Sequence, residues 1–234
     1  MIFQKIWISI IGIFFTLIFS VLILLVGFFD KNKKYTAILS KYWARSILFF
    51  SFIKYNVIGI NNIIKSNNYV LVSNHQSGFD ILVTFASLDI PISFFTKKEL
   101  FYIPLFGWAL KAAGMVYVDR FNKDKSKLSI NDGLEKITNT FLSILVYPEA
   151  TRTNYNELGE FKKGAFILSV ESQKPIIPLT VLYKHDPKKI INYQITLLVG
   201  NQIDSLNYNI EQKDILLVKV KEVIQSNINS YLEN

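Results

Sequence analysis

The residue types best suited to acid–base chemistry lie in one short stretch, Asn74 to Asp80, with the sequence NHQSGFD. On a regular helix His75 and Asp80 would point about 140° apart around the axis, so they would not share a face. We therefore expect residues 76–78 to form a loop, in which Asp80 accepts a hydrogen bond from one imidazole nitrogen. The other nitrogen could then take a proton from a substrate hydroxyl. The simpler interpretation is an ordinary loop histidine followed by an acidic residue at a helix start.

Two further segments combine acidic and basic side chains, GMVYVDR at 114–120 and YPEATRT at 147–153. Arginine suits bidentate contact with phosphate, so Arg120 and Arg152 could hold a phosphate monoester beside the base. The alternative is that each arginine forms an ion pair with the acidic residue of its own segment.

The elements that must position these residues alternate between strands and helices, which predicts an α/β domain. The nearly continuous apolar strands favour a central, mostly parallel sheet covered by helices on both faces, with the chemistry in loops at strand ends. The expected strands are 69–73, 92–96, 115–118, 143–147, 176–182 and 193–200, and the expected helices are 80–88, 105–113, 124–141, 163–173 and 211–231.

The N-terminus carries an uncharged run from Ile6 to Phe29. As a helix it would measure about 36 Å against a hydrocarbon core of about 30 Å. The run is too long for a signal peptide and no small-residue cleavage site closes it, so we expect an uncleaved membrane anchor. Lys31, Lys33 and Lys34 follow it. The positive-inside rule then places the rest of the chain in the cytoplasm, at the inner (cell) membrane.

The next segment, 36–53, mixes large apolar residues with a few charges, as an interfacial amphipathic helix does. A soluble core helix is the alternative, and a hairpin that dips into one leaflet is another, because positive charge lies on both sides of the first segment. We assign residues 1–58 to the membrane-associated helical part and residues 59–234 to the catalytic domain.

The composition of the chain limits the classes of binding partner that we expect. The chain has 26 Lys and Arg against 18 Asp and Glu, a net charge of +8, which favours an anionic lipid surface. The basic residues are scattered without a nucleic-acid-binding motif, so no nucleic-acid partner is expected. With no cysteine and only two histidines, His75 and His185, no metal site is expected.

In order and spacing, these segments together resemble the 1-acyl-sn-glycerol-3-phosphate acyltransferase (lysophosphatidic acid acyltransferase) family of the glycerolipid acyltransferases. NHQSGFD resembles the family's NHX4D block, 114–120 its second block, YPEATRT its FPEGTR block, and Ile177-Pro178-Leu179 its fourth. The stretch 96–107, TKKELFYIPLFG, resembles a segment between the first and second blocks.

The resemblance implies a catalytic dyad of His75 and Asp80. It implies that arginines, together with Lys97 or its neighbour Lys98, bind the acceptor phosphate, and that Glu149 shapes that pocket or contacts the acceptor. The implied substrate-binding set is Lys97, Arg120, Glu149, Ala150, Thr151 and Arg152.

The implied reaction moves an acyl group from acyl-CoA or acyl carrier protein to the sn-2 hydroxyl of lysophosphatidic acid and gives phosphatidic acid, as a step of phospholipid biosynthesis that needs no metal or bound cofactor. Alternatives are another acceptor, namely a lyso-ornithine lipid, a lysophospholipid or glycerol 3-phosphate, or a non-catalytic lipid-binding protein of the same fold. The sequence departs from the pattern at Tyr147, where Phe is usual, and at Ala150, where Gly is usual. Because Ala avoids positive φ, we expect a negative φ at residue 150.

Overall fold

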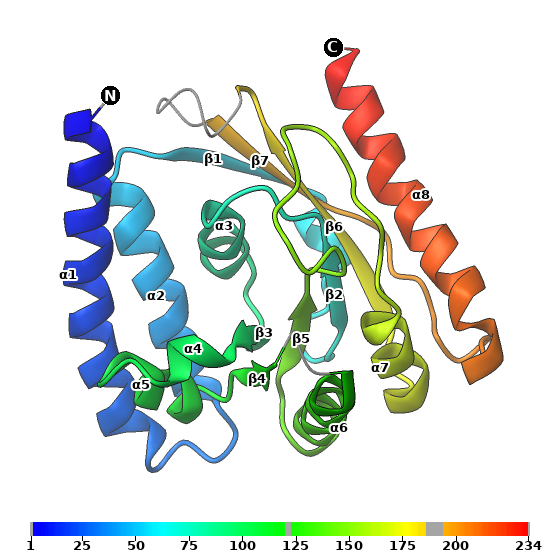
Figure 1. Ribbon diagram of the computed structural model, residues 1–234, viewed down its shortest axis with the longest axis horizontal. Helices are drawn as coiled ribbons and strands as arrows, with labels where there is room; N and C mark the ends of the chain where they lie inside the picture. Colours follow the sequence, from blue (N-terminus) through cyan, green and yellow to red (C-terminus); the bar gives the residue numbers. More distant parts are fainter. Residues whose placement is uncertain (1, 120–122, 186–193, 234) are drawn as a thin grey trace.

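A seven-stranded sheet runs through the centre of the protein (Figure 1). The computed structural model describes residues 2–119, 123–185 and 194–233. The strand order is β1-β7-β6-β2-β5-β3-β4; β6 and β7 pair antiparallel and all other neighbours pair parallel. The strands are β1 (Lys54–Ile58), β2 (Val70–Ser73), β3 (Ile92–Lys97), β4 (Val116–Val118), β5 (Ser143–Val146), β6 (Ile176–Tyr183) and β7 (Gln194–Val199). The predicted mostly parallel sheet is confirmed.

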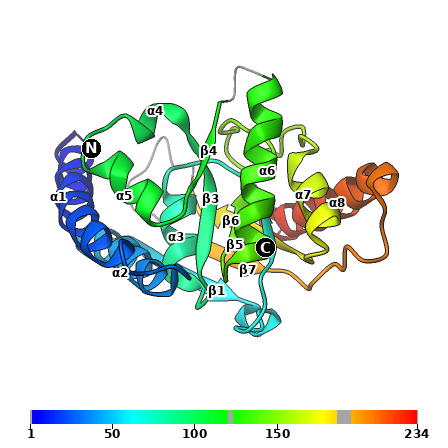
Figure 2. The same ribbon diagram turned by 90° about the horizontal axis from the view of Figure 1, so that it is seen from below.

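Helices cover both faces of this sheet, as Figures 1 and 2 show. One face carries α1 (Ile2–Gly27), α2 (Lys34–Phe50), α3 (Phe79–Ser87), α4 (Lys98–Phe101) and α5 (Phe106–Ala112). The other carries α6 (Lys123–Asn139), α7 (Gly164–Ser172) and α8 (Lys213–Leu232). Each face has its own apolar core, and all eight residues of β6 are buried. Burial on both faces explains why the strands read as continuous apolar runs.

The predicted strands and the five predicted helices of the domain agree with the structure to within two residues at each end. The proposed division after residue 58 is wrong for β1, because residues 54–58 pair with β7 and belong to the sheet. This edge strand alternates between exposed and half-buried positions. Its five mixed residues, KYNVI, therefore gave no apolar run that could be told apart from the preceding segment.

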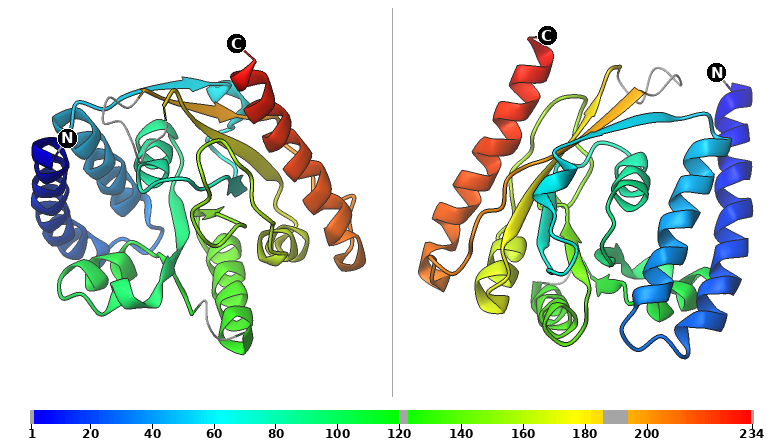
Figure 3. Two further views of the ribbon diagram at one scale, coloured as in Figure 1. Left: turned by 45° about the horizontal axis from the view of Figure 1, so that its top comes forward. Right: turned by 180° about the vertical axis from the view of Figure 1, so that it is seen from behind.

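Helix α1 lies alongside α2 along its length instead of projecting away from the domain (Figures 1 and 3). Trp7 Nε1 donates to Phe50 O at 2.8 Å near one end, and Trp43 Nε1 donates to Thr16 Oγ1 at 3.1 Å further along. At the other end Asp30 accepts the backbone N–H groups of Lys34 and Thr36 and so caps α2. Within the described residues, α1 is the one helix long and apolar enough to cross a membrane.

Helix α2 has two apolar sides of different character. Its domain-facing side buries mostly small residues that permit close packing, namely Thr36, Ser40, Ala44, Ile47 and Leu48. Its other side exposes large apolar residues, including Tyr35, Ile38, Tyr42 and Phe49. Helix α2 therefore has features of both a core helix and an interfacial amphipathic helix, because one side packs in the core and the other exposes apolar residues.

Candidate active site

The predicted site segments meet at one edge of the sheet. His75 follows β2, residues 147–153 follow β5, Lys97 ends β3 and Asp119 follows β4. These four strands are consecutive neighbours and all run parallel, so their carboxyl ends share an edge, the usual place for ligands in α/β sheets. Arg120, also predicted here, lies outside the described residues.

His75 and Asp80 form a hydrogen-bonded pair. His75 Nδ1 lies 2.8 Å from Asp80 Oδ2, because the chain bends at residues 76–78 before α3 begins. The same oxygen accepts the backbone N–H groups of Gln76 at 2.7 Å and Ser77 at 2.8 Å. An oxygen that accepts two amide protons is poorly placed to donate, so we assign the shared proton to Nδ1. In the neutral imidazole, Nε2 then carries the lone pair. The predicted loop is confirmed, and the pair has the geometry of an oriented base.

The second oxygen of Asp80 is also occupied. Tyr183, at the end of β6, donates its hydroxyl proton to Asp80 Oδ1. Burial raises the pKa of Tyr183 well above its usual value, and the negative charge of Asp80 raises it further. Tyr183 therefore stays neutral and acts as a donor, and the fully buried carboxylate has four hydrogen bonds in all.

The imidazole ring is held from one face and through its backbone. The Tyr147 ring stacks on it with centroids 4.3 Å apart and planes 26° apart. Glu149 Oε1 accepts the backbone N–H of His75 at 3.0 Å, while the backbone N–H of Thr153 donates to His75 O at 2.9 Å. The side chain of His75 keeps 11% of its surface exposed. The imidazole of His75 is thus held in place and remains partly accessible.

Glu149 joins two loops. Besides His75, it accepts the backbone N–H of Gly159 through Oε2 at 3.2 Å. It is buried, and this burial raises the pKa of its carboxyl group above the ordinary value, against the opposing effect of these hydrogen bonds. Of the two roles expected for Glu149, this geometry fits the shaping of the pocket, because both carboxylate oxygens already bind backbone amides.

Ala150 adopts φ = 61°, so the expectation of a negative φ is wrong. The backbone N–H of Ala150 donates to Tyr147 O at 3.0 Å and closes the turn. Three residues later, the backbone N–H of Thr153 donates to His75 O. The residue between these two hydrogen bonds has the left-handed conformation, which glycine adopts freely and alanine only at a cost.

The cationic residues lie around this turn and the adjacent strand end. A Cβ built on Gly78 would lie 3.4 Å from an Arg152 guanidinium nitrogen, so Arg152 reaches from the β5 loop to the start of α3 beside His75. Lys98 Nζ donates to Asp119 Oδ2 at 2.8 Å, which commits Lys98 to an ion pair. Lys97 is exposed at the end of β3, and Thr151 is exposed beside Arg152.

Three supporting residues were missed by the sequence reasoning. Asn74 bridges to β6, donating from Nδ2 to Val181 O at 2.9 Å and accepting the Val181 N–H through Oδ1 at 2.8 Å. Tyr183 and Tyr147 contact the dyad directly. Asn74 sits inside the NHQSGFD stretch and could have been suspected, whereas Tyr183 is 103 positions from Asp80 and only the fold brings the two together. The second histidine, His185, is exposed beyond β6.

Comparison with known proteins defines the class to which this fold and site belong. The acyltransferase family model matches residues 54–182, more than half of the chain and all four motif segments. The chain therefore belongs to the acyltransferase family, as the motifs predicted.

Its relatives point to one branch of that family. The chain is 32% identical over 184 residues to the chloroplastic 1-acyl-sn-glycerol-3-phosphate acyltransferase of Arabidopsis thaliana, covering 73% of this chain and 51% of the relative. It is 25% identical over 221 residues to the Escherichia coli 1-acyl-sn-glycerol-3-phosphate acyltransferase, covering 91% and 90%. The crystal structure of the 1-acyl-sn-glycerophosphate acyltransferase PlsC from Thermotoga maritima shares the fold, with a TM-score of 0.83, 21% identity and coverage of 100% and 96%. The chain spans about half the length of the plant relatives.

Proposed function

We propose that the protein is a membrane-bound 1-acylglycerol-3-phosphate O-acyltransferase with His75 as general base. The observation that carries this proposal is the position of the Asp80 Oδ2 atom, which accepts a hydrogen bond from His75 Nδ1–H and leaves Nε2 as the proton acceptor. A neutral, oriented imidazole at the carboxyl edge of a parallel sheet is suited to deprotonating an alcohol. The protein needs no nucleophile of its own, because the substrate hydroxyl supplies it.

The proposed reaction balances within these groups. His75 Nε2 takes the proton of the sn-2 hydroxyl while that oxygen attacks the thioester carbonyl. The C–O bond forms, the C–S bond breaks, and the imidazolium returns the proton to the leaving thiolate. Asp80 stabilises the transient imidazolium. No metal or bound cofactor takes part.

The oxyanion that develops on the carbonyl requires a donor. Two sets of backbone N–H groups are near enough to His75 to be considered. The N–H of Ala150 is already bonded to Tyr147 O. At the start of α3 the N–H groups of Phe79 and Asp80 already donate to Ser77 Oγ and Ser77 O. We therefore propose the N–H of Gly78 as the oxyanion donor.

The acceptor phosphate is assigned to the cations around the dyad. Arg152 lies against Gly78, within one turn of the base, and can form the bidentate contact that suits a phosphate monoester. Lys97 and Arg120 are proposed to complete the site from the neighbouring strand ends. The names of the relatives support the same acceptor, a 1-acyl-glycerol 3-phosphate.

A donor-by-acceptor assay on the full chain in detergent tests this function. Acyl-CoA and acyl carrier protein donors are crossed with lysophosphatidic acid, glycerol 3-phosphate, a lysophospholipid and a lyso-ornithine lipid. We expect lysophosphatidic acid to give the highest kcat/KM with at least one donor. Preference for another acceptor would reassign the substrate, and absence of turnover with every pair would favour a lipid-binding protein of the same fold.

We further propose that α1 and α2 attach the protein to the cytoplasmic face of the cell membrane as one helical hairpin. The support is their close packing together with exposed apolar residues on both helices, a surface that a bilayer would cover. Deleting residues 1–30 should release much of the protein from vesicles. This attachment would be contradicted by a full-length chain that does not float together with vesicles and that stays soluble without detergent.

A further inference from the structure

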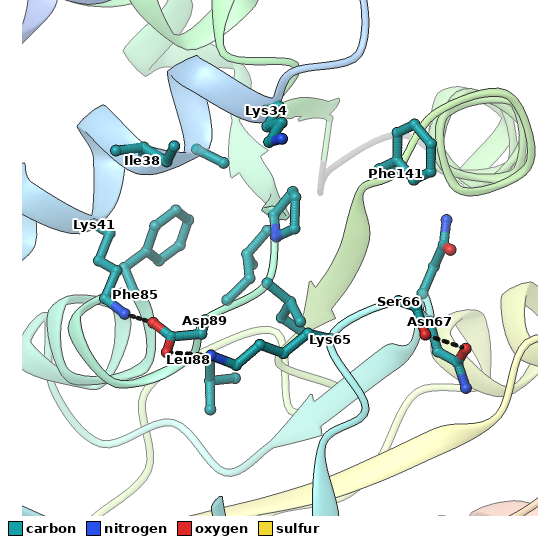
Figure 4. A pocket seen from close by; sticks show the side chains of 15 residues that line it. Lys34, Ile38, Lys41, Lys65, Ser66, Asn67, Phe85, Leu88, Asp89 and Phe141 are labelled. Atoms are coloured by element: carbon teal, nitrogen blue, oxygen red, sulfur yellow. Dashed lines mark hydrogen bonds and ion pairs between the residues drawn. The ribbon is translucent and has the colours of Figure 1, made fainter.

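A cavity of about 570 Å³ is lined by residues that precede β2, β3 and β5, and Figure 4 shows its side chains. It lies at the opposite edge of the sheet from His75, which follows β2. It is an open cavity lined by the first turns of α2, by residues 65–68 before β2, by residues 88–92 between α3 and β3, and by Phe141 before β5. Strands β2, β3 and β5 begin at this cavity and end at the site around His75. The cavity is therefore separate from the catalytic edge, and its volume falls in the usual range for small-molecule sites, about 300 to 1,000 Å³.

The cavity carries more positive than negative charge. Asp89 pairs with Lys41 through one carboxylate oxygen and with Lys65 through the other, at 3.0 Å. Lys34 adds a third ammonium group on the opposite wall (Figure 4). Burial, followed by repulsion from Arg45 and Lys65, lowers the pKa of Lys41. The carboxylate of Asp89 is thus shared by the ammonium groups of Lys41 and Lys65. A bound anion would reduce the repulsion between these two ammonium groups.

Much of the remaining lining is apolar. Side chains from α2, from α3 with the loop after it, and from the start of β5 contribute hydrocarbon surface, namely Ile38, Phe85, Leu88, Ile92 and Phe141. A small hydrophilic anion would gain nothing from this surface. An amphiphile with a phosphate and an acyl chain would bury its hydrocarbon there, at about 25 cal/mol per Å².

The cavity is continuous with the surface that we assign to the bilayer. Ile38, which lines the cavity, lies on the exposed side of α2 with Tyr35, Tyr42 and Phe49. The successive spacings of three, four and seven residues place them on one face. A lipid could thus enter from the membrane surface along this face without passing the catalytic edge.

We propose that this cavity binds an anionic glycerophospholipid, with its phosphate on Lys34 and Lys65 and its first chain carbons on Ile38 and the other apolar lining residues. Bound there, the lipid would connect α2 to the loop between α3 and β3 and so stabilise the contact between the anchor and the domain. The proposal shares with the proposed function only the position of α2 at the bilayer; it requires no chemistry at His75.

The test uses the full chain in neutral detergent micelles with phosphatidylglycerol, whose phosphate is a diester and which is not the proposed acceptor. Bound lipid is counted by native mass spectrometry, and the thermal midpoint is followed with increasing lipid. We expect one phosphatidylglycerol per chain, bound about tenfold or more tightly than phosphatidylcholine, and a rise in Tm. His75→Ala should bind the lipid as the wild type does, because the two sites are at opposite edges of the sheet.

Two kinds of variant distinguish lipid binding in the cavity from nonspecific binding to a basic surface. Lys34→Gln with Lys65→Gln should weaken binding by about tenfold, whereas Lys219→Gln, an exposed lysine on α8, should not. Ala37→Phe keeps every charge but fills the cavity that Ala37 lines, and it should remove the preference for phosphatidylglycerol.

Three results would overturn the proposal. Equal binding of phosphatidylglycerol and phosphatidylcholine would show that the site does not recognise the net charge of the lipid headgroup. Unchanged binding by Ala37→Phe would place the lipid on the outer surface. Equally tight binding of inorganic phosphate would show a simple anion site in which the apolar lining has no part.

Discussion

Asp80 Oδ2 lies 2.8 Å from His75 Nδ1 and accepts two backbone N–H groups as well. If His75 is the general base, His75→Ala should lower kcat by roughly 10²- to 10⁴-fold, the usual contribution of such a base. Steady-state acyl transfer to lysophosphatidic acid measures this. The thermal midpoint should change little, and a variant that keeps activity within about threefold of wild type would remove His75 from the mechanism.

Asp80→Asn should cost less than His75→Ala. An amide can place its oxygen where Oδ2 accepts the two backbone protons and the Nδ1 proton, and turn its NH₂ group towards the Tyr183 oxygen. The correct tautomer then survives, and only the negative charge that stabilises the imidazolium is lost. A loss of kcat as large as that of His75→Ala would show that the amide is flipped and holds the wrong tautomer.

Tyr183→Phe tests the hydrogen bond from the Tyr183 hydroxyl to Asp80 Oδ1. The variant removes one donor from a buried carboxylate, and hydrogen bonds to charged groups contribute about 1.5 to 3 kcal/mol. We expect the free energy of unfolding to fall by about that amount, and kcat to fall while the acceptor KM stays the same. The matched control is Tyr155→Phe, whose hydroxyl donates to the neutral backbone oxygens of Tyr183 and Lys184. Equal kcat losses in the two variants would indicate a general packing effect.

Arg152→Ala should mainly weaken use of the acceptor, because the guanidinium lies against Gly78 at the start of α3. Arg152→Lys should rescue poorly, since an ammonium group lacks the planar fork that binds phosphate through two bonds. The measurement is kcat/KM with varied lysophosphatidic acid at saturating donor. Lys219→Ala, which removes an exposed lysine on α8, is the control. A normal acceptor KM and kcat in Arg152→Ala would indicate a structural role instead.

Much of the fold could be predicted because its strands are buried on both faces. The whole of β6 is buried, and such strands appear in the sequence as apolar runs between helical patterns. The half-exposed edge strand β1, by contrast, has no such run, and its partner β7 lies far along the chain. Local pattern therefore located the strands of the interior and the edge strand β4, but not the edge strand β1.

The site was predictable to the extent that it is local in sequence. His75 and Asp80 are five residues apart, and the need for a loop between them follows from helix geometry. Tyr183 and Glu149 act across 103 and 74 residues, through contacts that exist only once the strands have paired. The backbone angle of Ala150 was also out of reach, because residue type argued for a negative φ and the tertiary bond between Thr153 and His75 imposes the opposite sign.

Glu149→Gln should destabilise the loops that hold His75. Glutamine offers one oxygen where the carboxylate accepts the N–H groups of both His75 and Gly159, so one buried amide loses its acceptor, at a cost of about 1 to 3 kcal/mol. The pKa of Glu149 is raised in the folded protein above the ordinary value of 4.5. Its titration therefore favours the folded state fully below that value, and this advantage is lost as pH rises through the folded pKa. The difference in free energy of unfolding between wild type and Glu149→Gln should accordingly shrink as pH rises from 4.5. A difference that grows with pH would contradict the raised pKa.

Ala150→Gly tests the turn that precedes Arg152, the residue proposed to bind the acceptor phosphate. With φ = 61°, the alanine Cβ approaches its own carbonyl oxygen, and the left-handed conformation costs an L-residue roughly 1 to 2 kcal/mol. Glycine removes that strain but gives back part of the gain, about 0.4 to 1 kcal/mol, through its greater freedom in the unfolded chain. The net expectation is a rise of between zero and about 1.6 kcal/mol in the free energy of unfolding.

The effect of Ala150→Gly on catalysis depends on where the Cβ atom points, and the variant distinguishes strain from obstruction. If Ala150 only strains the turn, the thermal midpoint should rise while kcat/KM for lysophosphatidic acid stays near wild type. If the methyl group also limits the approach of the acceptor phosphate to the backbone, kcat/KM should rise too. Ala165→Gly, at a buried position within α7, is the control for glycine's cost at an ordinary φ and should destabilise. A lower thermal midpoint in Ala150→Gly would contradict the positive φ at residue 150, because a relaxed alanine is the one case in which glycine only adds entropy to the unfolded chain.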